Sequence, residues 1–245
     1  MMTTASLPFL FPLKSADIDR RRAQILQALC TQDPDFAQIP VRRLQQRTLD
    51  CMLMLYDDIF LSSFLCRALP SLHVTLSFRL TSAAGKFLCT QDTRGKILNA
   101  EIRMSGDYLM RLCQGDFHLN GLTAHTPQDA FLIVFEHELC HALETALYGK
   151  TGHSKRFLSL ANGLFAHTDT RHSLPTRQLE AAQEGLRVGC RIRFPFQDHE
   201  LHGIISYIGK QATVMVPDSH GTYRDAHGKR YEKYRVPLPL LDLEP

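Results

Sequence analysis

The stretch that decides the fold runs from Thr126 to Phe157 and reads TPQDAFLIVFEHELCHALETALYGKTGHSKRF. Thr126 is a favourable N-cap, Pro127 suits the first helical position, and Gly149 is typical of the residue just past a helix end. Between these signals the segment is apolar almost all round, which indicates a helix that is buried rather than one lying on the surface. The sequence therefore predicts a core helix across this stretch.

The centre of this helix is the motif His-Glu-Leu-Cys-His, residues 137 to 141. Histidines four residues apart lie on one helical face with Cβ atoms about 5–6 Å apart, and two such imidazoles can reach one zinc ion at about 2.0–2.1 Å. Glu138 can then act on the attacking water without ligating the metal. The alternative is a pair of histidines hydrogen-bonded in a core. Burying His137, Glu138 and His141 is costly without a partner, and a metal is the simplest partner.

The third metal ligand has to come from outside the motif. Glu144 lies one turn beyond His141, but we expect it to point along the helix toward solvent or a basic partner. His153 follows a turn bracketed by two glycines and opens a second helix that faces the first. A helix-capping or exposed role is the alternative for His153. We therefore predict zinc ligands at His137, His141 and His153, with Glu138 as the catalytic base.

The run HELCHALE, followed after a short turn by GHSKRF, resembles the SprT-like domain, the zinc metallopeptidase-type domain that includes Spartan. That family carries HExxH on one helix and a third histidine in a Gly-His-x-x-x-Phe segment that opens the next helix. The resemblance implies the same three histidine ligands and a catalytic role for Glu138. Ser154 is a mild departure from the family pattern, and the paired CxxC motifs of a C-terminal zinc ribbon are missing. The resemblance covers roughly residues 50 to 170.

Composition bounds the protein's class and compartment. The chain has 245 residues with 44% hydrophobic content, enough for one large or two small domains, and a net charge of only +3. Seven cysteines are scattered without CxxC spacing, which favours reduced thiols in a cytoplasmic setting, and Cys140 is expected to be a small core residue. We expect neither a signal peptide nor a membrane span.

The segments before the motif are predicted as helices and then strands. An extended tail is expected over residues 1 to 15, followed by a helix that ends at about Cys30. The run of arginines at 20 to 22 in this helix is expected to be solvated, with phosphate binding as the alternative. A long helix is predicted from Val41 to Ala68. Its adjacent residues Asp57 and Asp58 point in different directions, so they do not form a paired-carboxylate site.

Three strands are expected next, at about 72–80, 87–90 and 97–104. In HExxH peptidases a strand beside the metal-binding helix pairs with extended substrate, and we assign this role to the third strand. His118 and His125 are expected to be exposed. His167 and His172 are expected to be solvated, with an approach to the metal or substrate as the alternative, and residues 176 to 185 are predicted as a short helix.

From Val188 the pattern changes to short strands split by turns, which suggests a small antiparallel barrel of SH3- or KOW-like type. Residues 187 to 235 contain nine basic and five acidic residues. Basic groups attract phosphates and tyrosines stack on bases, so this segment either binds nucleic acid or is an ordinary solvated barrel whose tyrosines complete its core. The interleaved tyrosines are Tyr223, Tyr231 and Tyr234. The expected core residues are Val188, Ile192, Phe194, Ile204, Ile205, Ile208, Val214 and Val216.

These observations predict an α+β protein. Residues 1–48 form an N-terminal helical extension, and residues 49–172 form the SprT-like domain, a zincin-like arrangement with a small antiparallel sheet packed on helices. Residues 173–186 form a linker, and residues 187–245 form the small all-β barrel. The predicted function is that of a zinc metalloendopeptidase with a protein substrate. By the resemblance, that substrate would be associated with DNA, which the barrel would contact.

Two alternatives to this function remain open. The first is a non-catalytic zinc-containing module that binds nucleic acid or protein. The presence of Glu138 favours the enzyme over this module. The second alternative is a zinc hydrolase that acts on a non-peptide substrate, because the chemistry of zinc and water is not specific to peptides.

Overall fold

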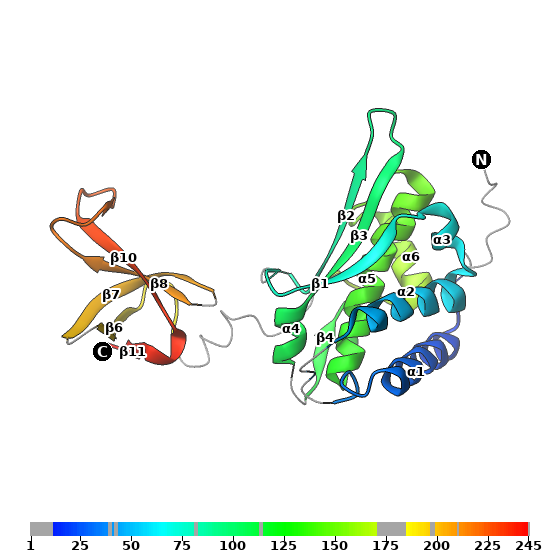
Figure 1. Cartoon of the computed structure of the whole chain (residues 1–245), viewed down its shortest axis with the longest axis horizontal. Helices are drawn as coiled ribbons and strands as arrows, with labels where there is room; N and C mark the ends of the chain where they lie inside the picture. The colour runs from blue at the N-terminus through cyan, green and yellow to red at the C-terminus, as the bar shows by residue number, and fades with distance from the viewer. Residues whose placement is uncertain are drawn as a thin grey trace. The chain divides into compact units, whose positions relative to one another are not determined.

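The computed structural model describes residues 12–38, 41, 44–80, 83–112, 115–170, 185–196, 199–209 and 211–244. The chain divides into two compact units, residues 1–174 and 175–245, each with its own hydrophobic core (Figure 1). The chain is a mixed α+β protein, as predicted. Residues 176–184 of the predicted short helix, and most of the predicted tail and linker, lie outside the described residues.

The described part of the first unit contains six helices: α1 (Ser15–Gln32), α2 (Gln46–Leu61), α3 (Phe64–Ala68), α4 (Gly106–Arg111), α5 (Pro127–Tyr148) and α6 (Lys155–Phe165). The prediction of one long helix from 41 to 68 is wrong, because α2 and α3 are separate helices. Ser62 and Ser63 between them have φ angles of 54° and 56°, in the left-handed region that ends a helix. The carboxylate of Asp57 accepts the backbone N–H groups of Leu65 and Cys66 at 2.8 Å and so caps α3.

The three predicted strands form one small sheet from β1 (Leu72–Ser77), β2 (Gly85–Gln91) and β3 (Ile97–Ser105), in the order β1-β3-β2. The predicted antiparallel sheet is wrong in one respect, because β1 runs parallel to β3 while β2 is antiparallel to it. The central position of β3 also overturns its predicted role as the strand that pairs with substrate, because both of its edges are already occupied. A separate hairpin joins β4 (Phe117–Leu119) to β5 (Leu122–Ala124).

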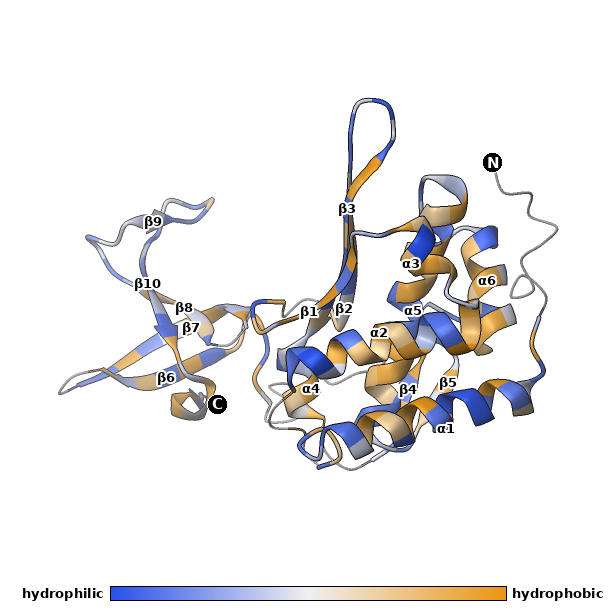
Figure 2. Ribbon diagram, turned by 45° about the vertical axis from the view of Figure 1, so that its right-hand side comes forward, coloured by the Kyte–Doolittle hydropathy of each residue, from blue (hydrophilic) through white to orange (hydrophobic). Residues whose placement is uncertain are grey.

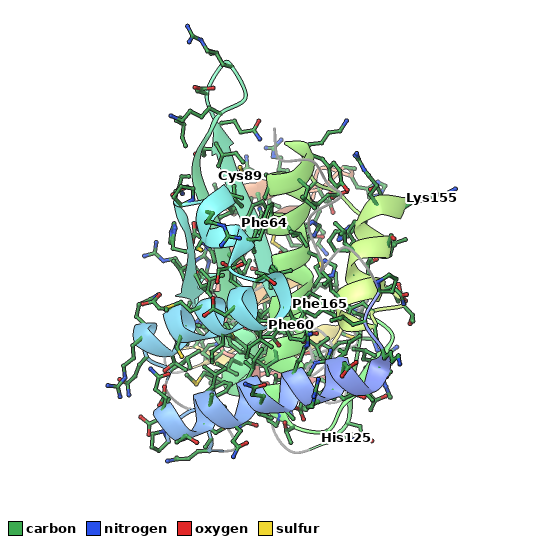
Figure 3. All side chains as sticks on the ribbon, turned by 90° about the vertical axis from the view of Figure 1, so that its right-hand side faces the viewer. Phe60, Phe64, Cys89, His125, Lys155 and Phe165 are labelled. Atoms are coloured by element: carbon green, nitrogen blue, oxygen red, sulfur yellow. The ribbon has the colours of Figure 1, made fainter. Side chains whose placement is uncertain are left out.

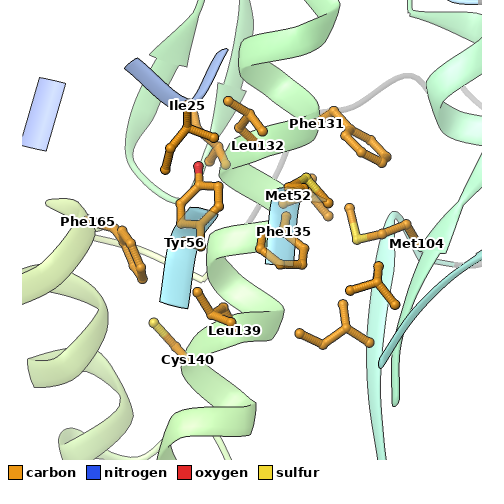
Figure 4. Packing of buried hydrophobic residues seen from close by; sticks show 14 of the residues in the cluster. Ile25, Met52, Tyr56, Met104, Phe131, Leu132, Phe135, Leu139, Cys140 and Phe165 are labelled. Carbon is orange, nitrogen blue, oxygen red and sulfur yellow. The ribbon is translucent and has the colours of Figure 1, made fainter. Parts of the chain in front are cut away.

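The core of the first unit forms where α1, α2, α5 and α6 meet. Ile25 of α1, Tyr56 of α2, Phe135 of α5 and Phe165 of α6 are all buried, and they lie around one another in Figure 4. In Figure 2, α1 and α2 each carry a hydrophilic and a hydrophobic side. Residues 1–48, predicted as an N-terminal extension, therefore contribute α1 to the same core as the motif helix.

The second unit is a six-stranded antiparallel sheet in the order β11-β6-β7-β8-β10-β9. Its strands are β6 (Arg191–Phe196), β7 (His199–Ile208), β8 (Ala212–Pro217), β9 (Tyr223–Arg224), β10 (Arg230–Val236) and β11 (Asp242–Leu243), with a 3-10 turn at Leu238–Leu240. Six of the eight predicted core residues are buried. The other two, Val188 and Ile204, are 58% and 38% exposed, and Ile204 lies on the outer face of the sheet. Within the described strands no pairing closes this sheet into a barrel.

Among the described residues, no helix is both long enough and apolar enough to cross a membrane.

Candidate metal centre

Helix α5 begins and ends where the sequence predicts. The Thr126 hydroxyl accepts the backbone N–H of Asp129 at 3.0 Å, and Pro127 occupies the first helical position. Gly149 ends the helix with a φ of 74°. Because His137 and His141 are four residues apart on this helix, they lie on the same face, and both are partly buried.

The structure brings the three predicted ligands together. One nitrogen from each of His137, His141 and His153 lies within 4.8 Å of the other two, and the Nε2 atoms of His137 and His153 are 3.0 Å apart. His153 belongs to the turn before α6, whose first residues are capped by Ser154. The buried ring of Phe157 packs against all three imidazoles, with centroid distances of 4.4 to 5.1 Å. Three residues from two elements are therefore held as one cluster.

The chemistry of this donor set fits a metal ion. Imidazole binds metals in its neutral form, and burial together with the neighbouring His153 lowers the pKa of His141 to about 4. His141 is thus neutral near physiological pH. The cluster of His137, His141 and His153 could hold a metal ion.

Glu138 points into the same site from the adjacent position on α5. Its side chain is buried, and burial raises the pKa of its carboxyl to about 7, against an opposing contribution from the backbone N–H of Phe87. Strand β2 approaches it so closely that a Cβ at Gly85 would lie 2.8 Å from its Cγ and 2.9 Å from its Oε1. Gly85 is therefore the residue that admits the Glu138 side chain beneath the strand.

A cleft of about 380 Å³ opens over the histidines and Glu138. Its walls come from the start of β2, from the turn at Leu119 and Asn120, from the loop that carries His153, and from Thr170. The cleft is large enough for a few residues of an extended chain, which makes it a candidate binding site.

Glu144 was expected to point toward solvent or a basic partner, and the structure corrects the first of these alternatives. Glu144 is 1% exposed, and its carboxylate accepts hydrogen bonds from Thr151 Oγ1 at 2.9 Å, Gly152 N at 3.0 Å and Ser154 Oγ at 3.1 Å. Its Oε1 atom lies 3.9 Å from Nε of Arg156, so the alternative expectation of a basic partner is met. Glu144 therefore organises the loop that carries His153.

Glu136, for which no role was predicted, is fully buried beside the motif. Its carboxylate accepts two hydrogen bonds from Arg22 at 2.8 Å, one from Tyr56 Oη at 2.8 Å, and lies 3.0 Å from His167 Nε2. Burial acts to raise the pKa of Glu136, but Arg22 and His167 outweigh that effect and the pKa lies below its ordinary value. The only sequence signal was an acid that directly follows an apolar run in the first half of the helix.

Two related expectations are corrected by this cluster. His167 is 1% exposed rather than solvated. In the arginine run only Arg20 fits the solvated description: Arg22 binds Glu136, and Arg21 donates to the Ile59 carbonyl at 2.8 Å and lies over Phe60. These contacts account for two of the three arginines without a phosphate.

The remaining histidines and Cys140 were also given expected positions. His118 and His125 are exposed as expected, and Figure 3 shows His125 at the surface of the first unit. Cys140 is fully buried, as expected for a core residue. His172 lies outside the described residues.

Comparison with protein-family models and with curated proteins gave no match for this chain. The resemblance to the SprT-like domain therefore rests on the motif residues alone.

Proposed function

We propose that the first unit is a zinc-dependent metallopeptidase that cleaves extended polypeptide. The observation that carries this proposal is that three histidines, the buried Glu138 carboxylate and strand β2 meet in one cleft. Three protein ligands with a fourth position left open are typical of catalytic zinc, whereas structural zinc is enclosed by four. His137, His141 and His153 would hold the metal, as in the SprT-like pattern.

Zinc in this position would supply a Lewis acid for the scissile carbonyl and bring the pKa of a water toward about 7. Glu138 is the only carboxylate among the residues that line the described cleft. Its low exposure strengthens it as a base, and a cation in the cleft would keep it ionised. Glu138 takes the proton of the attacking water and delivers it to the leaving amine.

We assign the strand that pairs with substrate to β2 in place of β3. Strand β2 lies at one edge of the sheet, and no described strand pairs with its outer side. Its residues Gly85, Lys86 and Phe87 line the cleft. An extended peptide can hydrogen-bond to such an edge and so present its backbone, with little demand on its sequence, to Glu138 and the histidines.

The substitution Glu138→Gln tests this proposal. Wild type and variant, both loaded with zinc, are incubated with an unfolded protein, and the fragments are identified by intact mass. We expect Glu138→Gln to retain one zinc per chain and to cleave at least about 100-fold more slowly, which is the lower range for loss of a general base. Equal cleavage by the two proteins would remove Glu138 from the reaction, and a zinc-free wild type provides the control for a contaminating peptidase.

A second candidate function, nucleic-acid binding, is favoured by one face of the second unit. The strand register aligns Arg191, Ile204, Met215 and Lys233 in one row across β6, β7, β8 and β10. Arg235 lies on the same face of β10 beside Thr213, which in turn pairs with Tyr207. We call these residues the basic sheet face.

The basic sheet face combines unpaired cations with exposed aromatic surface. Within the described residues, Arg191, Lys233 and Arg235 make no ion pair, and Tyr207 is 57% exposed. Lys233 Nζ lies 3.9 Å over the ring of Tyr223, whereas Tyr234 packs with Phe194 on the core side. Cations beside aromatic rings suit single-stranded nucleic acid. In this proposal the second unit brings the peptidase to proteins on DNA.

A further inference from the structure

Glu144 is a buried carboxylate with a specific set of partners. A buried charge is costly unless it is paired and hydrogen-bonded, and Glu144 receives donors from Thr151, Gly152 and Ser154. All three donors flank His153 in the turn between α5 and α6. The carboxylate thus determines where the third predicted metal ligand stands.

The hydroxyl of Thr151 also contacts a second ligand, because its Oγ1 lies 2.7 Å from Nδ1 of His141. A hydroxyl has one proton, and an ionised carboxylate can only accept. The Thr151 proton therefore goes to Glu144, and the Thr151 oxygen accepts the Nδ1–H of His141. That assignment places the proton of His141 on Nδ1 and leaves the lone pair of Nε2 as the one that can bind a metal.

We infer that Glu144 and Thr151 form a positioning relay, in which the carboxylate orients the hydroxyl and the hydroxyl fixes the tautomer and ring orientation of His141. The inference rests on the metal-binding role proposed above. Two of the three predicted ligands, His141 and His153, are then positioned by one buried acid. Partners of this kind are typical of metal sites, and their loss costs about 10–100-fold in metal affinity.

The test compares Thr151→Val with Thr151→Ser in the full chain. Valine keeps the shape of threonine but removes the hydroxyl, and the exposed position of Thr151 makes either residue tolerable in the fold. Zinc affinity is measured by competition with a chromophoric chelator. We expect Thr151→Val to bind zinc about 10-fold or more weakly and Thr151→Ser to match wild type. Glu144→Gln should weaken binding as well, since an amide oxygen replaces a carboxylate that serves three donors.

A second readout is independent of the metal. Nitrogen NMR of the histidines in metal-free protein reports which ring nitrogen carries the proton. Wild type and Thr151→Ser should show His141 protonated on Nδ1, and Thr151→Val should show a mixture of tautomers. Equal zinc affinities and an unchanged tautomer in Thr151→Val would overturn the relay. A wild type with the expected tautomer but no zinc affinity would instead overturn the proposed function and leave the relay standing.

Discussion

Glu136 shows how much of this site depends on residues that do not line the cleft. It is one residue before His137, yet its carboxylate points to the opposite side of α5 and meets Arg22 and Tyr56 in the core. Two parallel hydrogen bonds from Arg22 give this pair a fixed geometry. The pair therefore locks α1 to the motif helix directly behind the histidines.

Arg22→Met should be strongly destabilising. The change leaves the Glu136 charge buried with only neutral donors and His167, and breaking a buried pair in this way costs about 3–5 kcal/mol. Urea unfolding followed by circular dichroism measures the free energy of unfolding. Arg20→Met is the matched control, because the Arg20 side chain is 72% exposed and its loss should stay within about 0.5 kcal/mol.

The double variant Arg22→Met with Glu136→Gln completes this experiment. Removing both charges should restore part of the lost stability, because no uncompensated charge is left in the core. If Arg22→Met unfolds at the same urea concentration as Arg20→Met, the pair contributes nothing and this account of Glu136 is wrong.

At this scale the sequence predicts the residues whose chemistry depends on local spacing. His137, Glu138 and His141 sit within one helical turn or so, and His153 follows within a short loop, so their meeting can be anticipated from the motif. The roles of Glu136 and Arg22 cannot be anticipated in this way. The two residues are 114 positions apart, and the local sequence around one gives no indication that it pairs with the other.

Among the elements, the contact between β2 and α5 decides how Glu138 is placed. The start of β2 passes directly over Glu138, and Gly85 is the point of closest approach. Gly85 has a φ that any residue can adopt, so its role is the space it leaves and not its backbone freedom.

Gly85→Ala should uncouple catalysis from metal binding. The added methyl would meet Glu138 at less than 3.0 Å, so either the carboxylate or the strand must move. A displacement of about 1 Å can cost about 100-fold in rate, while the three histidines keep their places. We expect cleavage to fall steeply with zinc affinity unchanged.

The matched control for this change is Gly163→Ala on α6. A Cβ there would meet Pro12 no closer than 3.6 Å, an ordinary contact, and alanine favours a helix. Cleavage by Gly85→Ala at the rate of Gly163→Ala would show that the proximity of β2 to Glu138 has no catalytic consequence.

The elements themselves were largely predictable, but their pairing was not. Alternation and caps locate β3 and α5 within a residue or two of their observed ends. The strand order β1-β3-β2 depends on which strands pair in space. The alternation of apolar and polar residues that identifies a strand does not indicate which other strands it pairs with. The break between α2 and α3 was not predicted, because the sequence around Ser62 and Ser63 contains no glycine or proline to mark a helix end. The break is visible only in the structure, where both serines have positive φ angles and Asp57 caps α3.

The whole molecule joins a candidate peptidase to a candidate binding unit in one chain. A tether of this kind raises the effective concentration of whatever the second unit holds near the first, without any contact between the two sites. If both proposals hold, the basic sheet face would select which proteins are cleaved, and the cleft would add little selectivity of its own.

Replacing Arg191, Lys233 and Arg235 by glutamine in the full chain tests this division of labour. Three lost phosphate contacts should weaken binding to a labelled oligothymidine and make the salt dependence shallower by about two logarithmic units per decade of salt. Fluorescence anisotropy at several salt concentrations measures both. The control replaces Lys14, Arg94 and Lys155, three exposed cations of the first unit, and equal losses in the two triple variants would reject the basic sheet face as the binding surface.

The outer edge of β2, with which no described strand pairs, also bears on how copies of the protein behave together in solution. Backbone donors and acceptors that stand ready for a substrate are equally ready for the same strand of another molecule. If β2 binds the backbone of a substrate, as proposed, side-chain sequence would not prevent it from pairing with the β2 strand of a second copy. At high protein concentration such strand pairing between copies would compete with substrate for the edge of β2, and dilution or added unfolded chains would relieve that competition.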